Sequence, residues 1–558
     1  MNNWRFSLIL FFFCLAGVTI IGRLFYLQII QGDYWKALAQ GQQKFHVEFS
    51  GDRGEIYLSS RDENPYPLAV NRDWDLAYLS PAEICLEKND AEEIALKISE
   101  ILSLDKEWVL SRINREKSMY EKIKDRITPE ETELLIQADI PGLHIKQEKV
   151  RYYPQEELAA QVVGFVGGEK EGQYGIEGYY NEILKGEKTF QEGERWPKGY
   201  LINRALKKPK EGENLILTID YNIQFMAEKI LNEAQKNLDF ESATIIVSDP
   251  YTGKVLALAN YPSFNPNNYR QEENLRVFKN QAIQTIFEPG SIFKSITLAI
   301  ALEENKITPQ TSYVDEGFVK IHGYTLRNYA QRVWGRQTMT EVLEKSINTG
   351  VVLAQRMVGN ETFLEYLERL ELFEPTGIDL QGEVFSQNLS FKEGYEVNFA
   401  NASYGQGIGL TSMQIVKAFS ALANGGKIYD PFIVERDNPI IQGRRVFSPQ
   451  TSSQITSMMV SVTENGFAKT ARVPGYYVAG KTGTAQVSWA SLGINQRGYS
   501  DKTIQSFVGY APAFDPAFVI LVKLDNPKAR TAEYSAAPIF GELAKYILDY
   551  YQIAPDRE

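Results

Sequence analysis

The chain has 558 residues, of which 44% are hydrophobic and 23% charged, so it is long enough for two or three globular domains. Its formal net charge is −12, which argues against a nucleic-acid-binding protein, because such a protein needs a basic surface. The two cysteines and the three histidines are scattered. They predict no disulfide framework, no Cys/His metal site and no Ser-His-Asp triad.

The first predicted element is an apolar helix near the N-terminus. Residues 6–21 carry no charge and lie between Arg5 and Arg23, a length near the short end of the about 17–25 residues that a bilayer span needs. No small-residue cleavage site follows, which favours a retained anchor over a removed signal peptide. We therefore expect a cytoplasmic tail over 1–5 and a single transmembrane helix over 6–22 in the cytoplasmic (inner) membrane, with the remaining chain outside.

Two regions follow before the largest domain. Residues 23–47 alternate apolar and polar side chains at helical spacing, which predicts a stalk that continues the membrane helix. Residues 48–200 contain short β-rich pieces and charged helices, one of which starts with a capping box made by Thr128 and Glu131. A stretch rich in Lys, Glu, Gly and Pro over 187–214 marks the expected domain boundary.

The large domain, expected over 201–558, alternates predicted strands with predicted helices. This mixture indicates an α/β or α+β domain in which helices pack on a sheet. The strands are expected at 243–250, 254–260 and 518–525, and the helices at 223–238, 291–305 and 412–424.

Ser291 and Lys294 form the first motif that carries chemistry. Pro289 and Gly290 precede the serine and an apolar helical pattern follows, so we expect Ser291 at a helix start with Lys294 one turn later on the same face. A serine hydroxyl becomes a nucleophile when a neighbouring base takes its proton, and a desolvated lysine can serve as that base. The spacing alone is weak evidence, because Ser103–Lys106 shares it by accident.

Two further polar motifs follow along the chain. Ser346 and Asn348 place a hydroxyl and an amide two positions apart, which suits a proton relay and a contact to a substrate carbonyl. The run Lys481–Thr484 follows GYYVAG, which is predicted as a strand. On a strand, the lysine and the threonine hydroxyls would bind a carboxylate, and the glycine would let a substrate backbone approach.

The order Ser-x-x-Lys, Ser-x-Asn, Lys-Thr-Gly is that of the penicilloyl serine transferases. With its flanking residues, the chain resembles class B penicillin-binding proteins, the monofunctional transpeptidases, over nearly its whole length, and the smaller domain looks closer to the division type than to the elongation type. Leu58 and Gln281 depart from the family pattern but lie outside the three motifs. The resemblance rests on EPGSIFK, SINTGVV, GIDLQGE and AGKTGTAQ in the large domain, and on RGEIY, RYYP and GQYGIEGYYNEILKG in the smaller one.

The resemblance implies a peptidoglycan D,D-transpeptidase that forms a serine acyl-enzyme with stem peptides, releases the terminal D-Ala and cross-links glycan strands. It assigns catalytic roles to Ser291, Lys294, Ser346 and Asn348, and substrate binding to Lys481, Thr482, Gly483 and Thr484. Acyl transfer through serine needs no metal and no organic cofactor, so none is expected.

The same resemblance carries expectations about fold and partners. It implies a transpeptidase domain with an antiparallel sheet flanked by helices, and an elongated, β-rich pedestal domain of the dimerisation type over 48–200. It also implies β-lactams as inhibitors, and as partners a SEDS-family glycosyltransferase and other membrane proteins of the division or elongation machinery.

Four other interpretations compete with this one. Gly475–Thr482 fits the phosphate-loop formula GxxxxGK[ST], but its loop is predicted as strand and no helix follows, which argues against nucleotide binding. A β-lactamase-like hydrolase is the nearest alternative, although no Glu-x-x-Leu-Asn box lies between Asn348 and Lys481. A non-catalytic scaffold of the cell-wall machinery is the alternative from another class, and three complete motifs favour an enzyme. A bifunctional synthase would need a glycosyltransferase signature before Glu187, and none is found there.

Overall fold

The computed structural model describes residues 4–32, 44–62, 64–86, 90–196, 199–202, 210–436, 442–489, 492–496 and 498–557. The chain divides into two units. One unit comprises Met1–Gly54 with Lys185–Glu213, and the other comprises Glu55–Leu184 with Asn214–Glu558.

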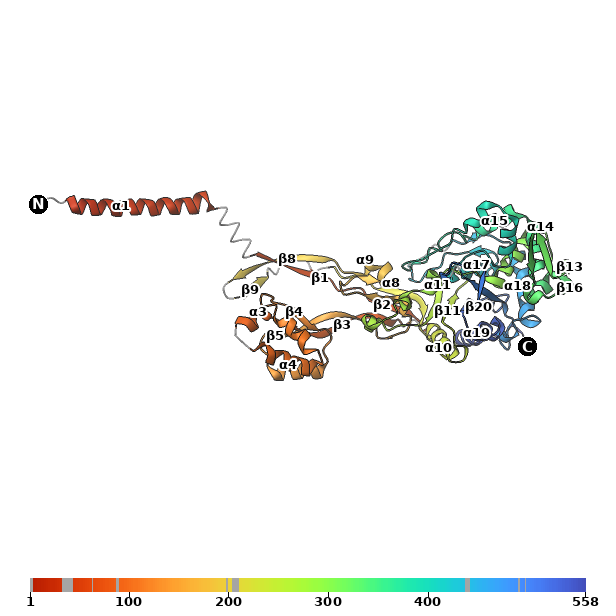
Figure 1. Cartoon of the computed structure of the whole chain (residues 1–558), viewed down its shortest axis with the longest axis horizontal. Helices are drawn as coiled ribbons and strands as arrows, with labels where there is room; N and C mark the ends of the chain where they lie inside the picture. Colours follow the sequence, from red (N-terminus) through yellow and green to blue (C-terminus); the bar gives the residue numbers. More distant parts are fainter. Residues whose placement is uncertain are drawn as a thin grey trace. The chain divides into compact units, whose positions relative to one another are not determined.

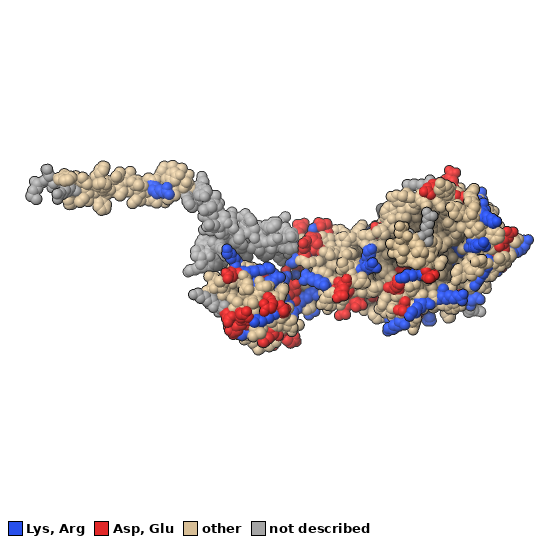
Figure 2. All heavy atoms as spheres, in the orientation of Figure 1, with Lys and Arg blue, Asp and Glu red and all other residues tan. Residues whose placement is uncertain are grey.

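The first unit contains the N-terminal helix and a small sheet. Helix α1 spans Trp4–Phe25 and continues as a π-helical turn, η1, over Tyr26–Ile30. Phe6–Ile30 is apolar and long enough to cross a membrane, and Figure 2 shows this helix as a run of uncharged side chains with a basic residue near its end. The apolar stretch thus extends past the expected span into the predicted stalk, of which residues 33–43 lie outside the described residues. The sheet has the antiparallel order β1-β8-β9, formed by Lys44–Ser50, Lys188–Trp196 and Gly199–Ile202.

The second unit begins with a five-stranded sheet, in which β10 pairs parallel with β2 and the other pairings are antiparallel. Four helices, α3 to α6, pack with its outer strands in one apolar core. The strands are β2 Ile56–Ser59, β3 Tyr66–Leu79, β4 Glu121–Lys124, β5 Leu143–Tyr152 and β10 Leu215–Asp220; the helices are α3 Pro81–Leu86, α4 Ala91–Leu102, α5 Lys106–Ile113 and α6 Pro129–Ala138.

Side-chain caps explain why these helices begin where they do. Asp90 accepts the free backbone N–H groups of Glu92 and Glu93 at the start of α4. Thr128 and Glu131 form the predicted capping box of α6, each accepting the other's backbone N–H. The caps satisfy donors that have no partner inside a helix.

Short elements connect this region to the large sheet. They are α7 Ala160–Val163, β6 Phe165–Val166, β7 Gly172–Gln173, α8 Gly175–Tyr179 and α9 Asn181–Leu184. Their buried side chains, among them Val162, Phe165 and Ile176, belong to the same apolar core as the large sheet. The connection is therefore packed rather than a loose linker.

The central sheet has the order β12-β11-β21-β20-β19, and every pairing in it is antiparallel. Of its three inner strands, β11 and β21 are almost fully buried, which explains their largely apolar sequences. The strands are β11 Ser242–Ser248, β12 Val255–Tyr261, β19 Ala479–Ser488, β20 Tyr499–Ala511 and β21 Phe518–Asp525.

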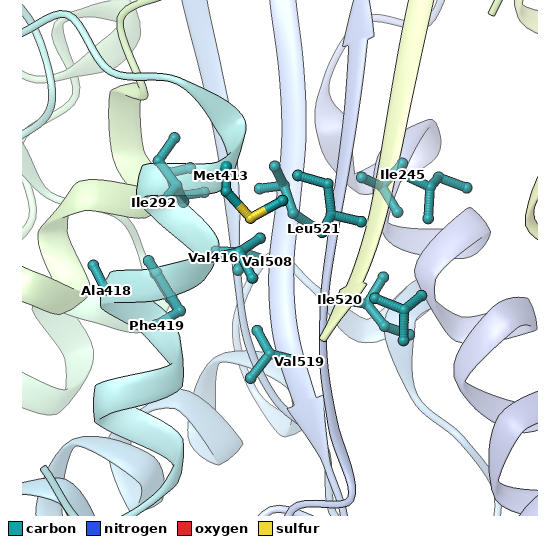
Figure 3. Packing of buried hydrophobic residues seen from close by; sticks show 14 of the residues in the cluster. Ile245, Ile292, Met413, Val416, Ala418, Phe419, Val508, Val519, Ile520 and Leu521 are labelled. Carbon is teal, nitrogen blue, oxygen red and sulfur yellow. The ribbon is translucent and has the colours of Figure 1, made fainter. Parts of the chain in front are cut away.

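Helices cover both faces of this sheet. Helix α17 (Ser412–Ala423) contacts β11, β20 and β21, and α19 (Ala536–Tyr551) contacts β20 and β21. Figure 3 shows Met413, Val416 and Phe419 of α17 pointing at the strands, with the C-terminal helix on the opposite side. The larger helices around them are α10 Tyr221–Leu238, α12 Lys294–Glu303, α14 Asn348–Val358, α15 Asn360–Arg369 and α18 Pro449–Glu464 (Figure 1).

Smaller elements complete the unit. The short helices and turns are η2 Pro266–Gln271, η3 Leu275–Phe278, α11 Gln281–Gln284, η4 Gly290–Phe293, η5 Tyr329–Gln331, α13 Met339–Glu344, η6 Leu389–Glu393, α16 Glu396–Ser403, η7 Lys469–Ala471 and η9 Ala532–Tyr534. The short strands are β13 Ser312–Asp315, β14 Phe318–Ile321, β15 Tyr324–Arg327, β16 Gly335–Thr338, β17 Lys427–Ile428 and β18 Arg444–Arg445.

The predicted antiparallel sheet with flanking helices is confirmed. The strand predicted over GYYVAG is wrong in its first part, because β19 begins only at Ala479. Pro474 and Gly475, which has φ +84°, instead make a turn closed by a hydrogen bond from Tyr476 N to Val473 O. Lys481 and Thr482 still lie within a strand and not before a helix, which excludes the phosphate-loop geometry.

Candidate active site

Ser291 lies in the η4 turn that leads directly into α12. The turn rests against β19: a methyl group placed on Gly483 would lie 3.0 Å from Pro289 O and 3.0 Å from the Ile292 side chain. Because only a residue without a side chain allows this approach, Gly483 brings the serine's turn next to the strand. The Ser291 hydroxyl makes no hydrogen bond within the described part of the chain, so it is available to attack a substrate.

A second close contact holds the turn from its other side. Gly290 N donates to Gly405 O at 2.9 Å, and Gly405 has φ +81°. A methyl group on Gly405 would lie 2.6 Å from Gly290 N and 2.7 Å from Gly290 C. The position of Ser291 therefore depends on two glycines, Gly405 and Gly483, which belong to distant segments.

The Lys294 ammonium is enclosed by the second motif. The side chain is fully buried in the first turn of α12. Its Nζ lies 2.6 Å from Ser346 O, 3.1 Å from Ser346 Oγ and 2.6 Å from Asn348 Oδ1. Ser346 O and Asn348 Oδ1 can accept the two N–H hydrogens of a neutral Lys294. The nitrogen lone pair then remains for a third partner.

Ser346 and Asn348 stand at the start of α14. Ser346 has φ +54°, a left-handed conformation that is strained for serine. Asn348 Nδ2 donates to Arg327 O in β15 at 2.9 Å, while its oxygen faces Lys294. The amide orientation is therefore fixed, with the acceptor oxygen directed at the lysine.

Lys481 approaches the same serine from β19. Its Nζ donates to Ser346 Oγ at 3.1 Å and to Thr482 O at 3.0 Å, and the side chain is fully buried. Two lysine side chains thus contact one hydroxyl, Lys294 from one side and Lys481 from the other. Thr484, further along β19, accepts a hydrogen bond from Ala532 N at 3.4 Å.

Burial lowers the pKa of both lysines. It lowers the pKa of Lys294 well below its ordinary value, and the nearby charge of Lys481 lowers it further. Burial also lowers the pKa of Lys481 to about 7. Both shifts disfavour the charged form in a dry site, which favours a neutral Lys294 that can act as a base.

A buried polar network that the sequence did not predict supports α14. Asp315 is 1% exposed and accepts hydrogen bonds from Thr349 Oγ1 at 2.6 Å, Asn328 Nδ2 at 3.0 Å and Trp334 N at 2.8 Å. Asn328 Oδ1 in turn accepts the Thr349 N–H. No local sequence signal indicates these partners, because they come together only through the fold.

Six of the eight predicted site residues fall into two groups. Lys294, Ser346, Asn348 and Lys481 are joined by hydrogen bonds, and Gly483 packs against the turn of Ser291. His144 and His322 pair instead with Glu83 and Glu396. Among the described residues, no group of three His, Cys, Asp or Glu side chains could hold a metal ion.

Comparison with known proteins identifies the family of the chain. Residues 243–545 match the penicillin binding protein transpeptidase domain, and residues 49–217 match the penicillin-binding protein dimerisation domain. The chain belongs to the penicillin-binding protein transpeptidase family. This confirms the predicted family, class B, and the predicted serine-transpeptidase class of enzyme.

Two relatives align with the penicillin-binding protein from end to end. It is 31% identical to stage V sporulation protein D of Bacillus subtilis, over 99% of this chain and 86% of that protein. It is 32% identical to the probable peptidoglycan D,D-transpeptidase PbpC of Pseudomonas aeruginosa, over 100% of this chain and 96% of that protein.

A solved structure supports the fold of this penicillin-binding protein. Penicillin binding protein 3 of Mycobacterium tuberculosis, solved in complex with aztreonam, superposes with a TM-score of 0.69 at 24% identity. The match covers 91% of this chain and 98% of the other. The similarity therefore includes the smaller domain as well as the transpeptidase domain.

Proposed function

We propose that this penicillin-binding protein is a membrane-anchored peptidoglycan D,D-transpeptidase with Ser291 as the acylated nucleophile. The observation that carries the proposal is the buried Lys294, whose lowered pKa and contacts to Ser346 and Asn348 make it a base one turn after the serine. The relatives named above, one of them a probable peptidoglycan D,D-transpeptidase, support the substrate class.

The first half-reaction forms the acyl-enzyme. Ser291 Oγ attacks the carbonyl of the penultimate D-Ala of a stem peptide, and Lys294 takes the hydroxyl proton. The bond to the terminal D-Ala breaks, and Ser346 Oγ, placed between Lys294 and Lys481, relays a proton to the leaving amine. Asn348 holds Lys294 and contacts the substrate.

The strand β19 binds the donor peptide. Lys481 with the hydroxyls of Thr482 and Thr484 receives the terminal carboxylate, and Gly483 leaves room for the substrate backbone. The backbone N–H groups of Ser291 and Thr484 form the oxyanion hole, in which one donor typically contributes about 2.7–4 kcal/mol.

The organisation of the chain follows the same proposal. Residues 1–5 form a cytoplasmic tail, 6–22 a transmembrane helix, 23–47 a stalk, 48–200 the pedestal and 201–558 the transpeptidase domain. The apolar Phe6–Ile30 segment supports the anchor. The anchor places the catalytic domain outside the cytoplasmic membrane, where its substrate lies.

A polytopic SEDS-family glycosyltransferase is the proposed partner, and a role in division rather than elongation is the proposed context. The contact surface comprises the membrane helix and the pedestal. Exchanging residues 1–47 for an unrelated anchor abolishes co-purification with that glycosyltransferase, whereas unchanged association would refute this part of the proposal.

Labelling with a fluorescent penicillin, followed by mass spectrometry of the adduct, tests the proposed nucleophile. The full chain in detergent forms a stable adduct on Ser291, and the Ser291→Ala variant forms none. Rapid hydrolysis of the label would indicate a β-lactamase-like hydrolase instead. A folded chain without any adduct would indicate a non-catalytic scaffold.

A further inference from the structure

A carboxylate lies beside the turn that carries the nucleophile. Glu288 is three residues before Ser291, and its segment is fixed by mutual hydrogen bonds between Phe287 and Leu410 at 2.9 Å. The Glu288 carboxylate accepts the Gly407 N–H at 3.2 Å and the Tyr499 hydroxyl at 3.1 Å. The position of this carboxylate is therefore defined by three separate segments.

Among the residues that the structure describes, the Glu288 carboxylate has no cationic partner. Within the described ranges, no lysine, arginine or histidine lies within ion-pair distance of Glu288. Burial raises the pKa of Glu288. Burial, together with the charge of Glu288, also raises the pKa of Tyr404 and of Tyr499. The described donors to this partly buried carboxylate, Gly407 N and the Tyr499 hydroxyl, are both neutral, an arrangement that costs stability unless a cationic ligand arrives.

The site can be reached from solvent. Tyr499 is 39% exposed and lines an open hollow together with Ser488, Ile494 and Gly498. A ligand that enters this hollow meets the tyrosine hydroxyl that bonds to Glu288. The donor peptide, by contrast, is assigned to the Lys481 side of the turn, so the two ligands would approach from different segments.

The second half-reaction of the proposed function brings a cationic substrate to the acyl-enzyme. Its acceptor is a primary amine, which is protonated near neutral pH and must lose a proton before it attacks. We propose that the Glu288 carboxylate binds the protonated amine of the acceptor and receives that proton. The inference rests on the proposed function and names the acceptor side of the same site.

Atoms and charges balance in this step. The ammonium R–NH3+ gives one proton to Glu288, which releases it to water. The amine nitrogen then bonds to the acyl carbon, the ester bond to Ser291 Oγ breaks, and the second proton passes to that oxygen. The products are an amide, the free Ser291 hydroxyl and one proton.

The test compares charged and uncharged acceptors on the full chain in detergent. An N-acyl-D-alanyl thioester serves as donor, glycinamide as the cationic acceptor and hydroxylamine as the neutral one, and mass spectrometry gives the ratio of aminolysis to hydrolysis. For Glu288→Gln, the ratio with glycinamide falls by about tenfold, while the ratio with hydroxylamine and the rate of penicillin acylation change by less than about threefold. Glu288→Asp, which keeps the charge, retains the preference for glycinamide.

Matched controls separate binding from a structural role. Glu361→Gln, which removes an exposed carboxylate on α15, leaves the ratio for both amines unchanged. Equal losses with both amines, or an equal loss of penicillin acylation, would assign Glu288 a structural role and overturn the proposal. An unchanged ratio would overturn it as well. A wild-type chain that penicillin does not acylate would overturn the proposed function itself.

Discussion

Replacing Gly405 by alanine tests how tightly the turn of Ser291 is held. The new methyl group would lie 2.6 Å from Gly290 N and 2.7 Å from Gly290 C, whereas non-bonded carbon atoms need about 3.5 Å. The obstacle is backbone and cannot rotate away, so the turn must move by close to an ångström. A shift of about 1 Å in a catalytic group can cost about 100-fold in rate.

The variant also introduces strain that must be separated from displacement. Gly405 has φ +81°, and a left-handed alanine costs about 1–2 kcal/mol. Gly425 has the same φ of +81°, but a methyl group placed on it would have nothing within 4 Å, so it is a matched control. Gly425→Ala therefore carries the strain without the collision.

The assay is the second-order rate constant for fluorescent-penicillin labelling, measured beside thermal unfolding for both variants. We expect Gly405→Ala to lose about 100-fold in labelling and Gly425→Ala to label at the wild-type rate with a slightly lower Tm. Wild-type labelling by Gly405→Ala would refute the argument that backbone contact positions Ser291. An equal loss in Gly425→Ala would attribute the effect to strain alone.

Three further predictions concern buried charges. Lys481→Met removes a charge that lowers the pKa of Lys294, so the pKa of Lys294 rises and the acid limb of the acylation-rate profile moves to higher pH. Arg151→Met breaks the buried ion pair in which Arg151 Nε lies 2.6 Å from the carboxylate of Glu177, and lowers the free energy of unfolding by about 3–5 kcal/mol. Asp315→Ala removes the acceptor of several buried donors and lowers the free energy of unfolding by about 3 kcal/mol.

Each of these predictions has a measurement that would contradict it. The first fails if the acid limb of the labelling profile keeps its midpoint in Lys481→Met. The other two are read from urea unfolding of the full chain in detergent. A loss in the free energy of unfolding below about 1 kcal/mol is typical of an exposed ion pair. Such a loss would contradict the prediction that these buried carboxylates depend on their partners. Glu93→Gln, in an exposed pair with Lys97, is the control for Arg151→Met.

Local structure could be predicted where the signal lies within one turn of the chain. The Thr128 capping box correctly indicated the start of α6. Pro289 and Gly290 indicated the turn before α12. In each case the residues that decide the structure are neighbours in sequence, and tertiary contacts did not override their local conformational preference.

The geometry of the site could not be predicted in the same way. The meeting of Lys294 and Lys481 at one hydroxyl joins segments whose contact depends on the whole sheet. The donors around Asp315 are likewise collected by the fold. The order of the motifs was enough to identify the site residues. The burial of the two lysines, which lowers their pKa, depends on the packing of the whole domain.

The pairing of β11 with β21 has a consequence for how the protein is made. Ser242 and Asp525, which are opposite each other in this pair, are 283 positions apart along the chain. Because synthesis begins at the N-terminus, β11 can pair with β21 only after almost the entire chain has been made. Such long-range pairing forms slowly. A chain that ends before β21 lacks the strand that joins β11 to β20, so its central sheet would be divided into two separate pairs of strands.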